Sequence, residues 1–358
     1  MALKFFGNIY QNKKVFVTGH TGFKGTWLCL WLKELGADVI GYSLPLNDKN
    51  QHFESLNLPI KNYFQDLNNY EELNKAIQES QPDIVFHLAA QSLVRESYRN
   101  PIYTFQTNLI GTLNLYEICT KIFSIKAIVS ITTDKVYQNE EWYWGYREID
   151  RLGGNDPYSA SKACVEIMTE SFRKSFLKEN QILLATARAG NVIGGGDWAK
   201  DRLIPDIMQA YQNQEVLIIR NPKSVRPWQH VLEPIAAYLL LGQRLLEKKD
   251  NFATAWNFGP DENDAVAVEQ VLGKINQFLP KIKIKYESSH LPEAQILKLD
   301  CSKAKTELRW KPIWNVDTAI QKTAEWYKEF VENGHIISKQ QLYEYLTDAQ
   351  QQQTIWLQ

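Results

Sequence analysis

Val15-Phe16-Val17-Thr18-Gly19-His20-Thr21-Gly22-Phe23-Lys24-Gly25 is the stretch that decides the fold. A short run of β-branched and aromatic residues ends in three glycines, each separated from the next by two residues, and an apolar run follows at 27–32. This order predicts a strand, a tight turn and a buried helix, which is the context that a dinucleotide-binding loop needs. Glycines let the backbone approach a pyrophosphate, and a helix N-terminus offers it unpaired N–H groups.

Apolar runs and helical patterns alternate through the first half of the chain, which predicts an α/β fold with a doubly wound parallel Rossmann sheet. Further strands are expected at 38–43, 63–67, 83–88, 126–132 and 182–188, and helices at 69–80, 102–122 and 158–177. After Gly190 the alternation of strands and helices becomes less regular, and a smaller, irregular C-terminal lobe is expected. The glutamine-rich segment from Gln340 onward is expected to form a surface helix or a frayed end.

The length of 358 residues favours two lobes rather than one core. We expect residues 1–189 to form a dinucleotide-binding domain, to which the chain returns at about 225–258, and residues 190–358 to form a substrate-binding domain. Ligands of such sheets bind outside the carboxyl ends of the strands, so the site should lie in the cleft between the lobes.

Composition excludes several classes of partner. The net charge of −1 argues against nucleic acid or an anionic membrane as the main partner. The four cysteines are far apart, which is typical of reduced thiols, and neither they nor the histidines have metal-ligand spacing. No apolar run is long enough for a signal peptide or a membrane span, so a cytoplasmic protein without a metal is expected.

Two clusters carry groups suited to proton transfer. Tyr158 and Lys162 stand four residues apart on an expected helix, where a lysine cation can lower the pKa of the phenol. This spacing is common, and by itself it also fits a solvated helix pair. Thr133, Asp134 and Lys135 follow the fifth expected strand at its carboxyl end. The alternative for this cluster is an ordinary Asp/Thr turn.

Four longer strings resemble a known family: residues 17–25, Thr133-Asp134-Lys135, residues 188–198 and Arg226-Pro227-Trp228-Gln229-His230-Val231. They are similar to the extended short-chain dehydrogenase/reductase superfamily, to its nucleotide-sugar 4,6-dehydratases, and in particular to the CDP-glucose 4,6-dehydratases. The resemblance covers most of the chain. It implies a hydro-lyase with a tightly held NAD that makes a 4-keto-6-deoxy sugar nucleotide for the deoxysugars of surface polysaccharide, such as the O-antigen of lipopolysaccharide.

The resemblance also implies roles for residues. Tyr158, with Lys162 and Thr133, would remove the proton of the sugar 4-hydroxyl. Thr133, Asn191 and Arg226 would bind the substrate, with Asn191 and Arg226 at the sugar diphosphate. The residues that would hold NAD are Gly19, His20, Thr21, Gly22, Phe23, Lys24, Gly25, Asp66, Leu67, Leu88, Ala89, Ala90, Gln91, Asn108, Tyr158 and Lys162. A homodimer or homotetramer would form through a four-helix contact made by the helices at 102–122 and 158–177.

Two features depart from the wider dehydratase pattern. Most relatives carry an acidic residue where this chain has Lys135, so Asp134 and Lys135 would share the elimination step, and which of them takes the C5 proton is open. His20 and Lys24 either point to solvent or face the cofactor, where Lys24 would attract the pyrophosphate and His20 would act through its bulk.

Other functions are weighed against this one. Another nucleotide sugar, such as GDP-mannose, dTDP-glucose or a UDP-sugar, could be the substrate of a dehydratase or of a 4-epimerase. The Asp134-Lys135 pair argues against the GDP-mannose and dTDP-glucose enzymes, and an epimerase needs no third proton-transfer group. A silent NAD-binding sensor would have no reason to keep Thr133, Tyr158 and Lys162 together.

Overall fold

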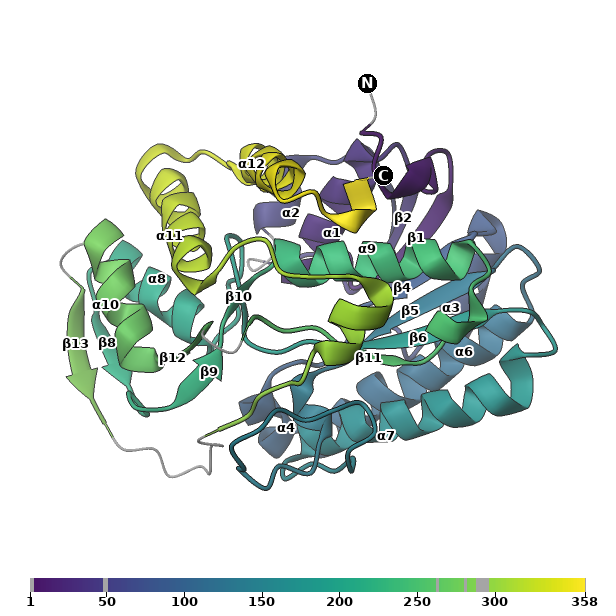
Figure 1. Cartoon of the computed structure of the whole chain (residues 1–358), viewed down its shortest axis with the longest axis horizontal. Coiled ribbons are helices and arrows are strands. Elements are labelled where there is room, and N and C mark those ends of the chain that lie inside the picture. The colour runs from purple at the N-terminus through teal and green to yellow at the C-terminus, as the bar shows by residue number, and fades with distance from the viewer. Residues whose placement is uncertain (1–2, 48–50, 262–263, 280–281, 288–295, 358) are drawn as a thin grey trace.

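A seven-stranded sheet lies at the centre of the computed structural model, which describes residues 3–47, 51–261, 264–279, 282–287 and 296–357 (Figure 1). Its strand order is β11-β6-β5-β4-β1-β2-β3, and all neighbouring strands run parallel. This is the Rossmann order with one further strand, so the predicted α/β doubly wound sheet is confirmed. The strands are β1 (Lys14–Thr18), β2 (Asp38–Ser43), β3 (Lys61–Phe64), β4 (Ile84–His87), β5 (Ala127–Ile131), β6 (Leu183–Arg188) and β11 (Ala255–Asn257).

Helices cover both faces of the sheet. On one face, α1 (Phe23–Glu34) and α9 (Leu232–Leu246) pack into the larger hydrophobic core. On the other face, α3 (Tyr70–Ser80), α6 (Gly111–Thr120) and α7 (Pro157–Phe172) enclose a second core. Apart from the edge strand β3, which is mostly exposed, the strands are buried on both sides and are nearly continuous apolar runs, as expected for a parallel sheet.

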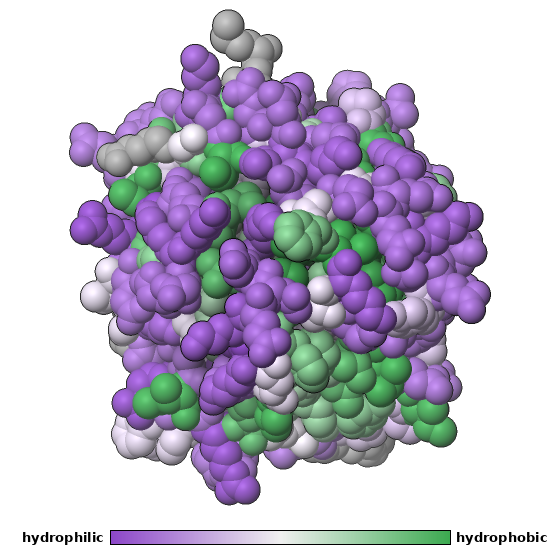
Figure 2. Space-filling view, turned by 90° about the vertical axis from the view of Figure 1, so that its right-hand side faces the viewer, coloured by the Kyte–Doolittle hydropathy of each residue, from purple (hydrophilic) through white to green (hydrophobic). Residues whose placement is uncertain are grey.

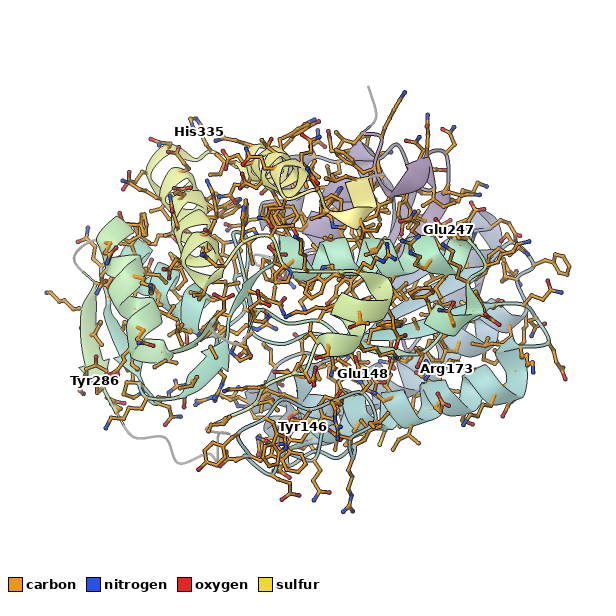
Figure 3. The ribbon with its side chains drawn as sticks, viewed as in Figure 1. Tyr146, Glu148, Arg173, Glu247, Tyr286 and His335 are labelled. Carbon is orange, nitrogen blue, oxygen red and sulfur yellow. The ribbon has the colours of Figure 1, made fainter. Side chains whose placement is uncertain are left out.

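The second lobe is built from short elements. Helices α8 (Leu203–Asn213) and α10 (Val268–Phe278) accompany two small sheets, in which β8 (Val216–Ile219) pairs with β13 (Lys283–Tyr286) and β9 (Val225–Pro227) pairs with β12 (Ala265–Ala267). Figure 3 shows Tyr286 at the outer edge of this lobe and Arg173 at the opposite end of the molecule. Between β9 and β12 the chain passes through α9 and β11, and both belong to the Rossmann layer.

The C-terminal segment is a packed part of the core rather than a frayed end. After α11 (Val316–Asn333), helix α12 (Ser338–Gln351) buries Leu342 and Tyr345 completely. Trp356 is also buried, and its ring stacks on those of Phe6 and Tyr345. The sequence pattern did not indicate this buried face, because the segment is rich in glutamine. The apolar character of α1 on all sides follows from its place between the sheet and this segment.

The remaining helices are α2 (Gln51–Leu56), α4 (Val94–Arg99) and α5 (Pro101–Phe105). A π-helical turn at Gln106–Ile110 joins α5 to α6, so the helix expected at 102–122 is present with a bulge in it. Within the described part of the chain, no helix combines the length and the apolar character that a membrane crossing requires.

Candidate active site

A cleft of about 1350 Å³ lies along the carboxyl ends of the sheet strands and extends to the second lobe. It brings together most of the residues that the sequence singles out. Those that line it are Gly19, Thr21, Gly22, Phe23, Lys24, Gly25, Asp66, Leu67, Leu88, Ala89, Ala90, Gln91, Thr133, Asp134, Lys135, Tyr158, Lys162, Asn191 and Arg226. The side chains of His20 and Asn108 are buried and are not part of the lining.

The glycine loop is held tightly against the neighbouring strand. Gly19 has a positive φ of 70°, and a Cβ there would lie 2.7 Å from the backbone nitrogen of Ala89, so glycine is required on both counts. Thr18 Oγ1 accepts hydrogen bonds from the N–H groups of Leu88 and Ala89, both at 3.1 Å. The N-cap of α1 is Gly22, which has no side chain to cap the helix. The first N–H groups of α1 therefore face the cleft without a side-chain cap, which fits the pyrophosphate of a dinucleotide.

His20 neither faces the cleft nor points to solvent. Its Nε2 is 2.9 Å from Asn62 Oδ1, and its ring packs on Phe53 and Phe64. A Cβ at Gly41 would lie 2.3 Å from the ring, so the glycine in β2 makes room for it. Burial lowers the pKa of His20 to about 4. The expected contact between the His20 side chain and a cofactor is therefore not found in this structure, because the imidazole fills the space between the loop and β2.

Lys24 does point into the cleft. Its Nζ donates to Tyr238 Oη at 3.5 Å, and burial lowers its pKa to about 8, with the charges of Arg202 and Lys162 acting in the same direction. The ammonium group therefore lies near the catalytic end of the cleft. Its attraction to a pyrophosphate stays a prediction.

Asp134 and Lys135 lie in a short 3₁₀ helix, Asp134–Val136, that follows β5, and Thr133 is its N-cap. Thr133 Oγ1 donates to Asp134 Oδ1 at 2.9 Å, and Asn191 Nδ2 donates to the other carboxylate oxygen at 3.4 Å. Asn191 has a positive φ of 49°, a conformation that asparagine tolerates better than most residues. The second lobe thus contributes a partner to the carboxylate of Asp134.

Tyr158 and Lys162 lie one turn apart on α7 and both line the cleft. Burial raises the pKa of Tyr158 to about 12, while a hydrogen bond with Thr133 and the charge of Arg202 lower it. The Lys162 ammonium donates to the carbonyl oxygen of Ile131 at 3.3 Å, and burial lowers its pKa to about 8. The sequence predicts that Lys162 lowers the tyrosine pKa, whereas in the structure burial raises this pKa, and Thr133 and Arg202 are the groups that oppose the rise.

Asn108 is buried next to the cleft and holds two of the elements that line it. It sits in the π-helical turn, accepts from the N–H of Gln91 at 2.8 Å, and donates to the carbonyl oxygen of Gln91 and to Ser161 Oγ. These bonds tie the cofactor-side loop to α7. Asn108 is therefore placed as a positioning residue rather than as a cofactor contact.

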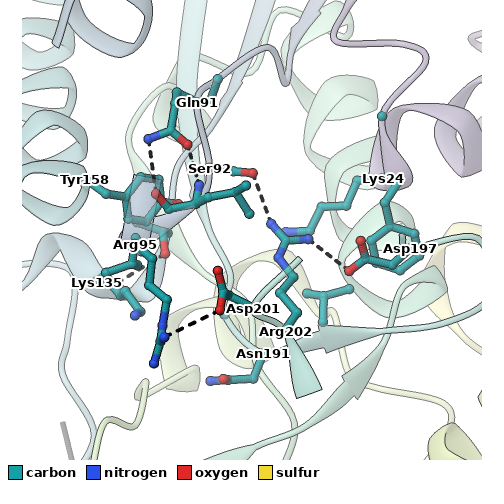
Figure 4. Close-up of a pocket in the computed structure, with 18 of the residues that line it drawn as sticks. Lys24, Gln91, Ser92, Arg95, Lys135, Tyr158, Asn191, Asp197, Asp201 and Arg202 are labelled. Atoms are coloured by element: carbon teal, nitrogen blue, oxygen red, sulfur yellow. Dashed lines mark hydrogen bonds and ion pairs between the residues drawn. The ribbon is translucent and has the colours of Figure 1, made fainter. Parts of the chain in front are cut away.

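Arg202 is a cleft residue that the sequence reasoning missed (Figure 4). Its guanidinium bridges Asp197, at 2.9 Å, and Ser92 Oγ, at 3.0 Å. Asp197 ends the Gly194-Gly195-Gly196 loop, and a Cβ at Gly195 or Gly196 would run into Trp326 or His52. The three glycines could have indicated a tightly packed loop, but nothing in the sequence shows that Arg202 turns back toward Tyr158.

A second set of charges lines the side of the cleft formed by the smaller lobe. Asp201 forms ion pairs with Arg95, at 3.5 Å, and with Arg220, at 3.3 Å. Burial raises the pKa of Asp206 to about 6, and the charge of Asp201 acts in the same direction. Arg226 also lines this side and donates to the carbonyl oxygen of Val225.

This arrangement can bind a dinucleotide and carry out proton transfer beside it. The glycine loop and α1 supply the anion site, and a hydroxyl, a phenol, a carboxylate and three ammonium groups lie at the other end of the same cleft. Guanidinium groups from both lobes suit a phosphorylated substrate. Among the described residues, no cluster of His, Cys, Asp or Glu has the geometry of a metal site.

Known proteins with similar sequences and structures carry out such chemistry. A family model described as GDP-mannose 4,6 dehydratase matches residues 16–323. The chain is 46% identical over 351 residues, which is 95% of this chain and 98% of the relative, to the CDP-glucose 4,6-dehydratase of Salmonella typhimurium. It is 25% identical over 342 residues, 90% of this chain and 98% of the relative, to a UDP-glucose 4-epimerase of Mycoplasma genitalium.

Solved structures share the fold. The UDP-glucose 4-epimerase of Thermotoga maritima, solved with UDP-glucose, superposes with a TM-score of 0.77 at 25% identity, covering 89% of this chain and 99% of that one. The dTDP-glucose 4,6-dehydratase of Bacillus anthracis, solved with NAD, gives a TM-score of 0.75 at 24% identity, covering 88% of this chain and 97% of that one.

Proposed function

This chain belongs to the GDP-mannose 4,6-dehydratase family, and on that premise we propose that it is an NAD-dependent hydro-lyase that converts CDP-glucose to CDP-4-keto-6-deoxyglucose. The observation that carries the proposal is the 46% identity, over almost the whole chain, with a relative that bears this name. It is supported by the convergence of Thr133, Asp134, Lys135 and Tyr158 on one cleft.

The cofactor would be held by the glycine loop and α1 at its pyrophosphate, with Asp66 and Leu67 on the adenosine side and Leu88 to Gln91 along its length. NAD, when bound, would supply the acceptor for a hydride from C4 of the sugar and the donor of the hydride to C6. No net redox equivalent is consumed.

The first proton transfer falls to Tyr158. Its phenolate takes the proton of the sugar 4-hydroxyl as C4 is oxidised, and Thr133 is within hydrogen-bonding reach of the same phenol. A phenolate in this buried place needs positive charge nearby. Arg202 supplies some of it, and a bound nicotinamide cation would add more.

Asp134 and Lys135 would carry out the elimination. Once C4 is a ketone, the proton on C5 is acidic. One of the two groups takes this proton, the other protonates the C6 hydroxyl as it leaves as water, and a proton returns to C5 when the hydride reaches C6. The protons balance, and the net change is the loss of one water. Asn191 would orient the acid through its contact with Asp134, and Arg226 would hold the diphosphate as a bidentate partner.

We also propose a homodimer or homotetramer that forms through α5, α6 and α7. Figure 2 shows a hydrophobic area in the lower part of the face that it presents, at the height of these helices. The exposed apolar side chains of these helices are Ile102, Tyr103 and Ile167, and Ile110 lies in the π-helical turn between α5 and α6; Ile102 is 73% exposed. Surface of this kind is typical of an interface between copies.

The cellular setting is proposed from the chemistry. Cys29, Cys119 and Cys301 are buried free thiols, which suits the reducing cytoplasm. A 4-keto-6-deoxy sugar nucleotide is the class of intermediate from which deoxysugars of surface polysaccharides such as the O-antigen are made.

The test is to incubate the purified protein with CDP-glucose, dTDP-glucose, GDP-mannose and UDP-glucose and to follow the ultraviolet band that 4-keto sugars give in alkali. We expect the band with CDP-glucose and much less with the other three. A band with another nucleotide only would reassign the substrate, and a change at C4 without this band would indicate an epimerase.

A further inference from the structure

A second, smaller cavity lies behind the catalytic carboxylate. It has a volume of about 180 Å³, enough for about six waters at about 30 Å³ each. Among the described residues, Asp134 and Gly190 line both this cavity and the main cleft. The two spaces therefore meet at one of the two side chains that would carry out the elimination.

Asp134 and Gly190 are in direct contact where the two spaces meet. A Cβ at Gly190 would lie 2.0 Å from Asp134 Oδ2 and 2.5 Å from Oδ1, so the carboxylate rests directly on the glycine backbone. Any other residue at position 190 would displace the carboxylate. The glycine thus keeps Asp134 in contact with both spaces.

The far end of the cavity reaches the molecular surface. Trp144 is 64% exposed, and Asp261 and Ser302 are also exposed on this side. Lys298 and Asp300 add further charged groups to the lining. A space with charged and hydroxyl groups along it holds water, in contrast to a purely apolar cavity. Figure 3 shows Tyr146, which follows the lining residue Gly145, at the lower edge of the molecule.

We propose that this cavity is a water passage for the elimination step, an inference that rests on the proposed function. During turnover the nucleotide sugar and the cofactor would occupy the main cleft, and the cavity would give the water released from C6 a second route to solvent. The passage lets this water leave past Asp134. It also lets protons exchange between Asp134, its neighbours and bulk solvent, whichever of Asp134 and Lys135 takes the C5 proton.

Gly259 offers a way to close the passage without touching the catalytic groups. It lines the cavity, and a Cβ there would have Cys301 Sγ at 3.4 Å and Leu299 Cβ at 3.8 Å as its nearest neighbours. A Gly259→Leu side chain would therefore reach into the space. Ala265→Leu narrows it from another wall, in case the first variant folds poorly. Gly273→Leu is the matched control, because a Cβ at Gly273 would have no neighbouring atom within 4 Å and Gly273 lines neither space.

The experiment is turnover of CDP-glucose in D₂O with bound NAD measured beforehand, reading kcat, KM and the hydrogen isotope at C5 of the product. The wild type and Gly273→Leu should introduce deuterium at C5. In Gly259→Leu and Ala265→Leu we expect kcat to fall several-fold and protium to persist at C5, because the abstracted proton returns before it exchanges, with KM and bound NAD unchanged. Wild-type kcat and full deuteration in both narrowed variants would overturn the passage alone. A wild type that makes no 4-keto product would overturn the proposed function and the passage with it.

Discussion

Arg202 and Asp197 form an ion pair of 2.9 Å at the edge of the cleft, and this pair holds the guanidinium where its charge opposes the rise in the pKa of Tyr158 that burial causes. Asp197 is fixed because the glycines before it pack beneath Trp326 and His52. A loop of the second lobe therefore adjusts the acidity of a residue on a Rossmann helix.

This relationship predicts the effect of Arg202→Met on the pH profile. Removal of the charge raises the pKa of Tyr158, so less phenolate is present at any given pH. The rising limb of kcat/KM against pH should move to higher pH, by about one unit if the guanidinium supplies a typical charge effect. Arg220→Met is the matched control, because Arg220 lines the same cleft but pairs with Asp201. A profile that stays in place in Arg202→Met would contradict the assignment.

The roles of Asp134 and Lys135 can be distinguished by the reaction step that is lost when each residue is replaced. If Lys135 is the C5 base, Lys135→Met should still oxidise C4 but should lose deuterium entry at C5 in D₂O. Asp134→Asn keeps the size of the side chain and removes the acid, so reduced cofactor should accumulate on the enzyme. Stopped-flow absorbance of the reduced nicotinamide and NMR of C5 measure the two effects. A Lys135→Met variant that incorporates deuterium at the native rate would remove Lys135 from that step.

Lys24 is expected to weaken the hold on oxidised cofactor. Its ammonium group lies near Arg202 and Lys162, where an oxidised nicotinamide would add a further positive charge. Lys24→Met should therefore raise the ratio of NAD to protein after purification. Because burial lowers its pKa to about 8, Lys24 is charged below that pH and neutral above it, so the wild type should retain NAD better above pH 8. Lys33→Met, at the other end of α1, is the control, and equal NAD content in all three proteins would refute this reading.

Glu233 should make stability depend on pH. It is fully buried and accepts from the N–H groups of Ile313 and Trp314 and from Tyr345 Oη. Burial raises its pKa to about 7, so the folded state favours the protonated form. The stabilisation is complete below the ordinary carboxyl pKa and is lost as pH rises through about 7, by about 3 kcal/mol in all.

Urea unfolding from pH 5 to pH 8 measures this loss. Glu233→Gln should be less stable than the wild type at pH 5, because it lacks a matching set of acceptors, but its stability should vary less with pH. Glu179→Gln, at an exposed position, should follow the wild-type curve. A Glu233→Gln curve parallel to that of the wild type would show that Glu233 is not the titrating group.

The local patterns predicted much of the sheet and the place of the cleft at one edge of it, for a physical reason. Strands buried on both faces and a glycine turn before a buried helix leave strong marks in the sequence, and parallel strands gather their carboxyl ends at one edge. Thr133 and Tyr158 therefore came together as expected.

The directions of individual side chains could not be predicted in this way. His20 turns into the core because Gly41 leaves space in the neighbouring strand, and that pairing appears only once β1 and β2 are in register. Arg202 reaches the site through a loop whose course depends on Trp326, more than a hundred positions further along the chain. Long-range packing of this kind leaves no periodic signal.

The most direct measurement is to give the enzyme CDP-glucose that carries deuterium at C4 and to locate the label in the product by NMR. The account predicts a 4-keto sugar whose C6 has become a methyl group that carries the deuterium, since the hydride leaves C4 and returns to C6 within one site. Deuterium found again at C4 of an inverted sugar, or a product with no methyl group, would contradict it.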